Sequence, residues 1–260
     1  MGILNITPDS FSEDGLYLKE TEAIKKAEQM VKDGADIIDI GGESSRPGST
    51  PISCREESER ILPIAKILVR ELDIPVSVDT YKSEVARRLL DVGVHIVNDI
   101  SGLRYDPQMA QIVSRYDVPL IIMHMKGSPK NMQDNPNYES LTHEISSFLQ
   151  NSINLAVDNG IGIQNIIIDP GIGFCKTVTH NLQILKNLSN FKTFGRPILI
   201  GTSRKSFIGK ILDLPIDKRL EGTAATVATS ILNGANIVRV HDVSSMSLVA
   251  KMIDAIMNCE

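Results

Sequence analysis

Three short carboxylate or amide side chains each stand at the end of a short apolar run, and a lysine follows another run. They are Asp79, Asn98, Asp169 and Lys205. A carboxylate can accept hydrogen bonds from an exocyclic amine and a ring N–H together, whereas an amide offers one donor face and one acceptor face. The sequence therefore predicts a pocket that binds a planar heterocycle with amide-like and amino edges.

A second group of side chains suits an anion. It consists of Arg46, Arg239, His241 and Asn5; Arg239 lies within the last apolar run, and the others follow apolar runs. Because arginine binds phosphate oxygens in bidentate fashion, two guanidiniums and an imidazole at one rim predict a phosphate or pyrophosphate site. Asn5 and nearby acids could also hold a Mg²⁺ ion that bridges phosphate oxygens.

Several of these residues have a structural alternative. Asp79 could cap the helix expected near Ser83. The segment 169–171 could form a turn. Ser203 could be a helix N-cap as well as part of a site. His124, which lies between two methionines, is expected to be a packed side chain.

Eight apolar, β-branched runs precede the polar residues: 2–4, 36–40, 76–78, 95–97, 120–123, 166–168, 198–200 and 237–240. Short continuous apolar runs are typical of strands buried on both faces. Segments with helical periodicity lie between most of them: 21–32, 56–72, 83–91, 107–115, 139–158, 180–188, 219–232 and 245–257. Alternating strands and helices along the chain predict parallel strands joined by crossover helices.

The residues before the strands form a regular pattern. The second to eighth runs are preceded alternately by glycine and proline: Gly34, Pro75, Gly93, Pro119, Gly160, Pro197 and Gly234. A glycine can end a helix in the left-handed conformation, and a proline also stops a helix. One repeat of this kind favours one closed architecture.

The sequence thus predicts an α/β fold, a (β/α)₈ TIM barrel that forms a single domain over residues 1–260. An open doubly wound sheet is the competing architecture, but no Gly-x-Gly-x-x-Gly motif follows the first run. The first run has almost no lead-in before Gly2, so residues expected upstream could be absent. Polar or ionisable residues stand at or just after the ends of all eight runs, and no comparable set marks their starts. This asymmetry predicts an enzyme with its site at the carboxyl ends of the strands.

Composition excludes several classes of protein. The net charge of −5 argues against nucleic-acid binding by bulk electrostatics. No apolar run approaches the length of a membrane span, and no signal peptide is visible, so no membrane partner is expected. Three cysteines without metal-ligand spacing predict reduced thiols in a cytoplasmic protein.

Seven motifs together resemble the dihydropteroate synthase family: MGILNITPDSFS at 1–12, GGESSRPG at 41–48, VDT at 78–80, NDI at 98–100, DPGIGF at 169–174, TSRK at 202–205 and RVHD at 239–242. They occur in order over residues 1–242. The resemblance implies a folate-pathway transferase that joins 6-hydroxymethyl-7,8-dihydropterin pyrophosphate to p-aminobenzoate. It also implies an SN1-like mechanism, a Mg²⁺ cofactor, a homodimer and a target for sulfonamides.

The resemblance also implies a role for individual residues. The pterin would be held by Asp79, Asn98, Met123, Asp169, Phe174, Gly201 and Lys205. The pyrophosphate would be held by Asn5, Ser45, Arg46, Arg239 and His241, with Mg²⁺ near Asn5. p-Aminobenzoate would contact Phe11, Pro47, Phe174 and Ser206. Catalysis would rest on Asp79, Asp169, Lys205 and Arg239.

Three rival functions stay open at this point. A methyltetrahydrofolate methyltransferase barrel would share the three ring-binding residues but would not need Arg46 or Arg239. A barrel enzyme that acts on a phosphorylated sugar would not need three residues suited to hydrogen-bond with the amide-like edges of a heterocycle. An inactive barrel that serves as a binding partner would not need the complete set of polar residues at the strand ends.

Overall fold

The computed structural model describes residues 1–7, 16–44, 49–127 and 136–259. Its strands are β1 (Gly2–Asn5), β2 (Ile38–Gly41), β3 (Val76–Asp79), β4 (Ile96–Asp99), β5 (Leu120–Met123), β6 (Ile166–Asp169), β7 (Leu199–Ile200) and β8 (Ile237–Val238). Its α-helices are α1 (Leu16–Lys32), α2 (Cys54–Glu71), α3 (Ser83–Leu90), α4 (Met109–Tyr116), α5 (Leu141–Asp158), α6 (Val178–Lys186), α7 (Ser206–Leu212), α8 (Leu220–Leu232) and α9 (Val243–Met257).

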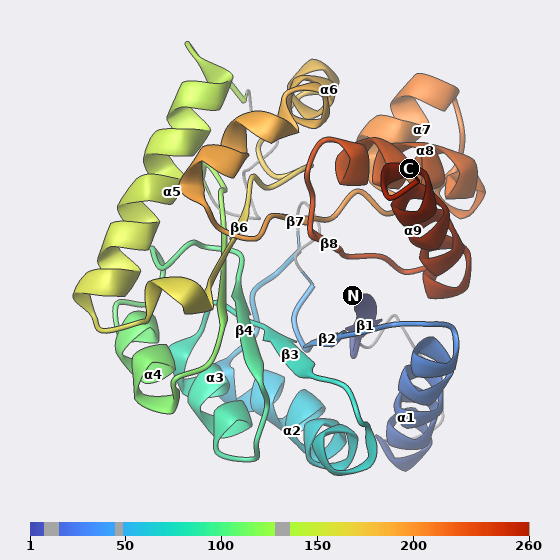
Figure 1. The fold of residues 1–260 in the computed structure, drawn as a ribbon. Helices are drawn as coiled ribbons and strands as arrows, with labels where there is room; N and C mark the ends of the chain where they lie inside the picture. The colour runs from blue at the N-terminus through green and yellow to red at the C-terminus, as the bar shows by residue number, and fades with distance from the viewer. Residues whose placement is uncertain (8–15, 45–48, 128–135, 260) are drawn as a thin grey trace.

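The strands form a closed parallel barrel. β1 to β6 pair in sequence order, and β7 pairs with β8. Parallel bridges between Ile168 and Ile198 and between Gly2 and Val240 join the two sheets at both edges. The helices surround the strands as an outer ring (Figure 1). The predicted TIM barrel is therefore confirmed, and the open-sheet alternative is wrong.

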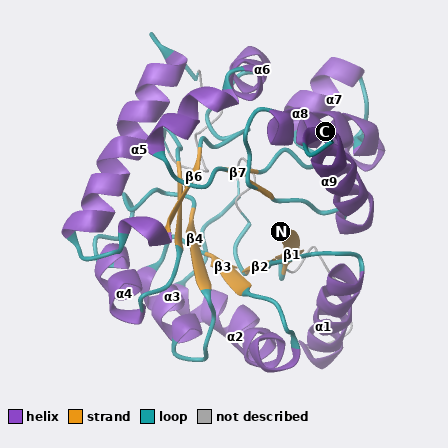
Figure 2. Ribbon diagram, in the orientation of Figure 1, coloured by secondary structure: helices purple, strands orange, loops and turns teal. Residues whose placement is uncertain are grey.

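Side chains on each strand point alternately outward to the helices and inward to the barrel. On β2, for example, Ile38 and Ile40 belong to the apolar layer between strands and helices. Ile37 packs inside the barrel, against the cluster formed by Met1, Ile96, Ile121 and Leu199. Helices cover the outside of the barrel on all sides (Figure 2). Both faces of the strands are thus buried, which explains why the runs are continuously apolar.

The alternation of glycine and proline has a backbone cause. Gly34, Gly93, Gly160 and Gly234 all have positive φ, from 88° to 104°. The carbonyl oxygen of each of the three prolines accepts a backbone hydrogen bond from the strand that precedes it in the chain: Ile38 N to Pro75 O (3.1 Å), Val97 N to Pro119 O (3.0 Å) and Ile168 N to Pro197 O (3.0 Å). The predicted glycine stops are confirmed. The helical segments before Pro119 and Pro197 already end at Asp117 and Gly195, which have positive φ, so these prolines serve to pair the strands.

The observed elements differ from the predicted ones in two main ways. Several strands run one residue beyond the apolar run, to Asn5, Gly41, Asp79 and Asp169, because backbone pairing does not depend on the polarity of the side chain. The helix α7 was not predicted, since its seven residues form only two turns and follow a polar loop without visible periodicity. Among the described residues, no helix is long and apolar enough to cross a membrane.

Candidate active site

The strand register places four of the strand-end residues in one row. Asn5 pairs with Gly41, Gly41 with Asp79, and Asp79 with Asn98 across β1 to β4. A β-carbon built on Gly41 would lie 3.7 Å from Asn5 Oδ1 and 3.6 Å from Asp79 Cβ. The side chains of Asn5 and Asp79 therefore flank Gly41 at the same end of the barrel.

Arg239, from the end of the β8 segment, lies in the middle of this region. Its Nη2 donates to Asp79 Oδ2 at 2.8 Å, and its Nε donates to Asp39 Oδ2 at 2.6 Å. Asp39 is fully buried and also accepts a hydrogen bond from Asn98 Nδ2 at 3.1 Å. Sequence reasoning missed Asp39, although a charged residue inside a run of buried strand residues was a visible signal.

Asp169 and Lys205 meet at the loop that follows β6. Asp169 is buried, and its Oδ1 accepts a hydrogen bond from Gly171 N at 2.7 Å, so it forms the turn and faces the site. The Lys205 ammonium donates to the carbonyl oxygen of Ile172 and lies 4.6 Å from the centre of the Phe174 ring. One loop thus brings together a carboxylate, a lysine and an aromatic ring.

Burial shifts the pKa values of these groups toward neutrality. Burial raises the pKa of Asp79 to about 7, opposed by Arg239 and reinforced by the charges of Asp39, Glu57 and Asp99. Burial lowers the pKa of Lys205 to about 8, with Asp169 and Asp79 acting in the opposite direction. Burial also raises the pKa of Asp169, against the nearby Lys205 ammonium. Perturbed pKa values of this kind, gathered at one end of a barrel, are typical of a functional site.

An apolar cluster borders the polar residues. It contains Ile100, Met123, Met125 and Cys175, with Tyr81 and Phe174 packed against it. Met123 is the last residue of β5 and pairs with Asp169 across β6. A bound planar heterocycle requires apolar contacts on its flat faces and polar groups that hydrogen-bond to its edges, and this arrangement offers both.

The loops after β7 and β8 are held together by two side-chain contacts. His241 Nδ1 lies 3.0 Å from Ser203 Oγ, and Arg204 forms a two-point ion pair with Asp242. Burial, together with the charges of Arg239 and Arg204, lowers the pKa of His241 to about 4, so the imidazole is neutral at pH 7. Ser203 is not the N-cap of α7, because that position belongs to Lys205.

Two further expectations can be compared with the structure. Asp79 does not cap α3, whose N-cap is Lys82 and lacks a side-chain cap bond. His124 is packed as predicted: it is buried, its ring lies edge-on to Phe148 at 4.9 Å, and its Nδ1 is 2.9 Å from Lys176 Nζ. Burial lowers the pKa of Lys176 to about 7. Nothing in the sequence distinguished this buried lysine from a surface residue.

Two of the remaining predicted residues, Ser206 and Gly201, can be placed in the structure. Phe11, Ser45, Arg46 and Pro47 lie outside the described residues. Ser206 is exposed at the start of α7. Gly201 lies beside Arg239, because a β-carbon built on it would be 3.8 Å from Arg239 Cβ.

The described residues include no group of three or more His, Cys, Asp or Glu side chains that could hold a metal ion. Asn5 Oδ1 is an oxygen atom that could coordinate a metal ion, and it lies at the edge of the site near the carboxylate of Asp79. Mg²⁺ usually keeps several waters and takes only one or two protein ligands together with substrate phosphates. The residues present therefore fit a Mg²⁺ ion carried by a phosphate ligand, and do not fit a cage of protein carboxylates.

The loop after β6 requires glycine at position 171. Gly171 has φ of +74°, and a β-carbon there would lie 1.9 Å from the carbonyl oxygen of His124. We expect Gly171→Ala to lower the free energy of unfolding by more than about 2 kcal/mol. Gly195→Ala is the matched control, because Gly195 also has positive φ (+61°) but would meet nothing within 4 Å. The control should cost about 1 kcal/mol in urea unfolding, and equal losses in both variants would contradict the steric argument.

Comparison with known proteins agrees with this arrangement. The family model described as pterin binding enzyme matches residues 1–241. The chain is 47% identical over 258 residues to a dihydropteroate synthase of Bacillus subtilis, covering 99% of this chain and 88% of that protein. It is 48% identical over 257 residues to a dihydropteroate synthase of Synechocystis, covering 98% and 89%.

Solved structures are equally similar. A dihydropteroate synthase from Clostridium difficile, crystallised in the presence of pteroic acid, has a TM-score of 0.94 and 46% identity, covering 100% of this chain and 96% of that chain. A Yersinia pestis dihydropteroate synthase with a sulfonamide drug complex has a TM-score of 0.95 and 39% identity, covering 100% and 94%. One from Xanthomonas albilineans with 4-aminobenzoic acid has a TM-score of 0.94 and 36% identity, covering 100% and 93%. The chain therefore belongs to the pterin-binding enzyme family, among the dihydropteroate synthases.

Proposed function

We propose that this chain condenses 6-hydroxymethyl-7,8-dihydropterin pyrophosphate with p-aminobenzoate, giving 7,8-dihydropteroate and pyrophosphate. The observation that carries the proposal is the meeting of buried carboxylate and amide groups with Arg239 at one end of the barrel. The first group suits the edges of a pterin ring, and the guanidinium suits the charged leaving group.

The pterin half of the site uses the residues on β3, β4 and β6. Asp79, Asn98 and Asp169 offer acceptors to the amino and ring N–H groups of the pterin, and Asn98 also has a donor. Lys205 donates to a ring carbonyl or nitrogen, and Met123 and Phe174 pack on the flat faces of the ring. The pteroic acid in the Clostridium difficile crystals supports a pterin ligand for that relative.

The pyrophosphate half uses Arg239 and His241, together with Asn5. Arg239 neutralises negative charge that increases as the leaving group departs, which favours the transition state over the bound substrate. Neutral His241 can donate one hydrogen bond to a phosphate oxygen. A Mg²⁺ ion held by Asn5 and the pyrophosphate would supply further charge neutralisation; Ser45 and Arg46 are proposed to contact the same group.

The carbon–oxygen bond of the pterin methylene breaks first, and its electron pair leaves with the pyrophosphate. The positive charge left on the methylene is delocalised into the pterin ring, where the Asp79 and Asp169 carboxylates stabilise it. The lone pair of the p-aminobenzoate amine then forms the new carbon–nitrogen bond, and the amine proton passes to water. An aryl amine is already a nucleophile, so no general base is needed.

The p-aminobenzoate side would be framed by Phe11, Pro47, Phe174 and Ser206. Ser206 is exposed next to Lys205 at the start of α7, which supports a contact between its hydroxyl and the carboxylate of p-aminobenzoate. Sulfonamides resemble p-aminobenzoate, and we propose that they compete with it here.

Product identification tests the proposed function. Protein incubated with both substrates and Mg²⁺ should yield a product with the mass of 7,8-dihydropteroate, and excess EDTA should abolish its formation. The mixture without p-aminobenzoate is the control. Methyl transfer from methyltetrahydrofolate to cobalamin, with no dihydropteroate formed, would favour the methyltransferase rival.

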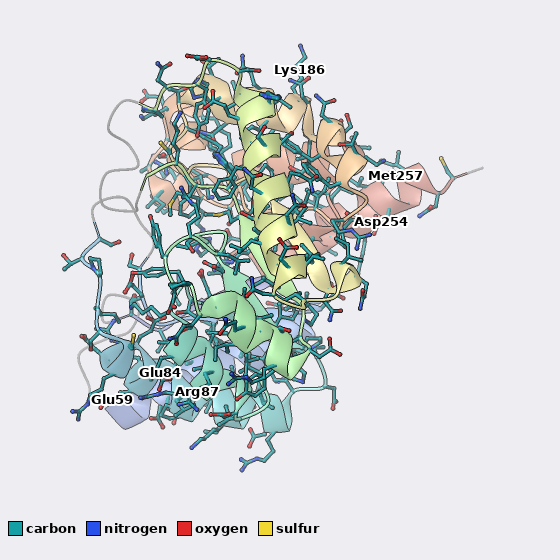
Figure 3. All side chains as sticks on the ribbon, turned by 90° about the vertical axis from the view of Figure 1, so that its left-hand side faces the viewer. Glu59, Glu84, Arg87, Lys186, Asp254 and Met257 are labelled. Carbon is teal, nitrogen blue, oxygen red and sulfur yellow. The ribbon has the colours of Figure 1, made fainter. Side chains whose placement is uncertain are left out.

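We also propose that the chain forms a cytoplasmic homodimer. Three residues spaced by four on α9 expose much of their apolar surface: Leu248 by 65%, Met252 by 62% and Ile256 by 50%. The end of α9 that carries Asp254 and Met257 projects beyond the neighbouring helices (Figure 3). Exposed apolar side chains gathered on one helix are typical of a protein interface.

A further inference from the structure

Asp39 lies one layer below the row of strand-end residues. It is two residues before Gly41 on β2, so its side chain points to the same interior side of the barrel. Its relative exposure is 0%, and its neighbours across β3 and β1 are Ser77 and Ile3. A substrate at the strand ends would meet the layer above Asp39 first, so a direct contact with substrate is not what this carboxylate provides.

One oxygen of Asp39 binds two residues of the site. Asp39 Oδ2 accepts from Arg239 Nε at 2.6 Å and from Asn98 Nδ2 at 3.1 Å. In the proposed function these two residues belong to different halves of the site, because Asn98 binds the pterin and Arg239 binds the pyrophosphate. Asp39 is thus the one described residue whose side chain bonds to both of them.

The contact with Asn98 decides which face of the amide the ligand meets. The Nδ2 of Asn98 is directed down to Asp39, so the opposite atom, Oδ1, is the one directed away from it. Asn98 therefore presents an acceptor to the ligand. The contact with Arg239 acts similarly, because Nε and Nη2 are fixed by Asp39 and Asp79 and the guanidinium plane has one orientation.

Stability does not explain Asp39. Its Oδ1 is buried and has no hydrogen-bond partner among the described residues, and the same is true of the hydroxyl of Ser77 beside it. A buried carboxylate with one unpartnered oxygen carries an uncompensated desolvation penalty. The two carboxylates Asp39 and Asp79 also share a single guanidinium. A residue present only to stabilise the barrel would be apolar, like Ile37 or Ile121 in the cluster inside the barrel.

We propose that Asp39 is a positioning residue: it holds the guanidinium of Arg239 and the amide of Asn98 in the orientations that the two halves of the substrate require. The proposal rests on the proposed function. It predicts that loss of the Asp39 charge harms turnover more than it harms folding.

Asp39→Asn is the first test, with Ser77→Ala as the matched control in the same layer of the next strand. We expect kcat/KM to fall about 10- to 100-fold in Asp39→Asn, as for the loss of a charge-assisted hydrogen bond, with unfolding in urea close to that of the original protein. Ser77→Ala should leave kcat/KM unchanged. A loss of stability with unchanged kcat/KM, or an equal fall in kcat/KM for both variants, would overturn the proposal.

The pH dependence of kcat/KM provides a second test, because a purely structural role of Asp39 would leave it unchanged. The charges that face Asp79 are Arg239 and Lys205, which lower its pKa, and Asp39, Glu57 and Asp99, which raise it. Asp39→Asn removes one of the charges that raise the pKa of Asp79, so the acidic limb of kcat/KM should move to lower pH than in the original protein. An unshifted limb would contradict the proposal.

Two further measurements keep the test independent of folding and of the reaction itself. If Asp39→Asn does not fold, Asp39→Glu provides the test, because it retains the charge and displaces it. The kcat/KM of Asp39→Glu should fall at least 10-fold, and the acidic limb of its pH profile should not shift. An unchanged kcat/KM would overturn the proposal.

Calorimetry with inorganic pyrophosphate reports the orientation of Arg239 without turnover. We expect about 10-fold weaker binding in Asp39→Asn, and unchanged binding would overturn the role of Asp39. Failure of the unmodified protein to form dihydropteroate would instead reject the proposed function.

Discussion

Arg239→Ala should be strongly destabilising, with a loss of about 3–5 kcal/mol in the free energy of unfolding measured by urea denaturation. The substitution removes the guanidinium that pairs with Asp39, whose side chain is completely buried. Asp79 loses its ion-pair partner at the same time. Removing one partner of a buried pair is costly because the remaining charge stays desolvated.

Arg204→Ala is the control for this prediction. Arg204 also forms a two-point ion pair, with Asp242, but its side chain is 40% exposed. An exposed pair contributes about 1 kcal/mol or less, so this variant should remain close to the original protein. The double variant Arg239→Ala/Asp39→Asn should recover part of the lost stability. Equal stability of the two alanine variants would show that Asp39 does not depend on Arg239.

Asp169→Asn should weaken binding of 6-hydroxymethylpterin about 10- to 100-fold in calorimetry, because it removes charge-assisted hydrogen bonds in a buried site. The asparagine can still accept the hydrogen bond from Gly171 N, so the loop after β6 should keep its conformation. Binding of inorganic pyrophosphate should change much less, since that ligand is assigned to Arg239.

Asp106→Asn is the matched control, because Asp106 also accepts hydrogen bonds from backbone amides but at the start of α3, through Ser83 N at 2.8 Å. Its affinity for the pterin should equal that of the original protein. An Asp169→Asn variant that binds the pterin normally, or that loses pyrophosphate affinity to the same extent, would reject the division of the site into two halves.

The fold could be predicted from the sequence because each strand carries a strong local signal. Strands buried on both faces are continuously apolar, and the glycines and prolines between them have fixed backbone roles, as at Gly34 and Pro75. The short helix α7 could not be found in this way, since two turns are too few to show a helical period.

The candidate site was predicted to the extent that it depends on strand ends. Asp79, Asn98, Asp169 and Arg239 follow strands or end them, and the parallel register brings them to one end of the barrel. Asp39 could not be found from the strand ends, because it lies on the interior face of an apolar run and not after it. Lys176 was missed because its burial depends on the packing of His124 and the loop after β6, which no local pattern encodes.

The most direct test of whether the chain transfers the pterin group to p-aminobenzoate is to measure whether pyrophosphate release depends on that amine. Protein with the pterin pyrophosphate and Mg²⁺ should release pyrophosphate only when p-aminobenzoate is present, in one-to-one proportion to the dihydropteroate formed. Pyrophosphate released at the same rate without p-aminobenzoate would contradict the account, because it would make the chain a hydrolase of the pterin pyrophosphate.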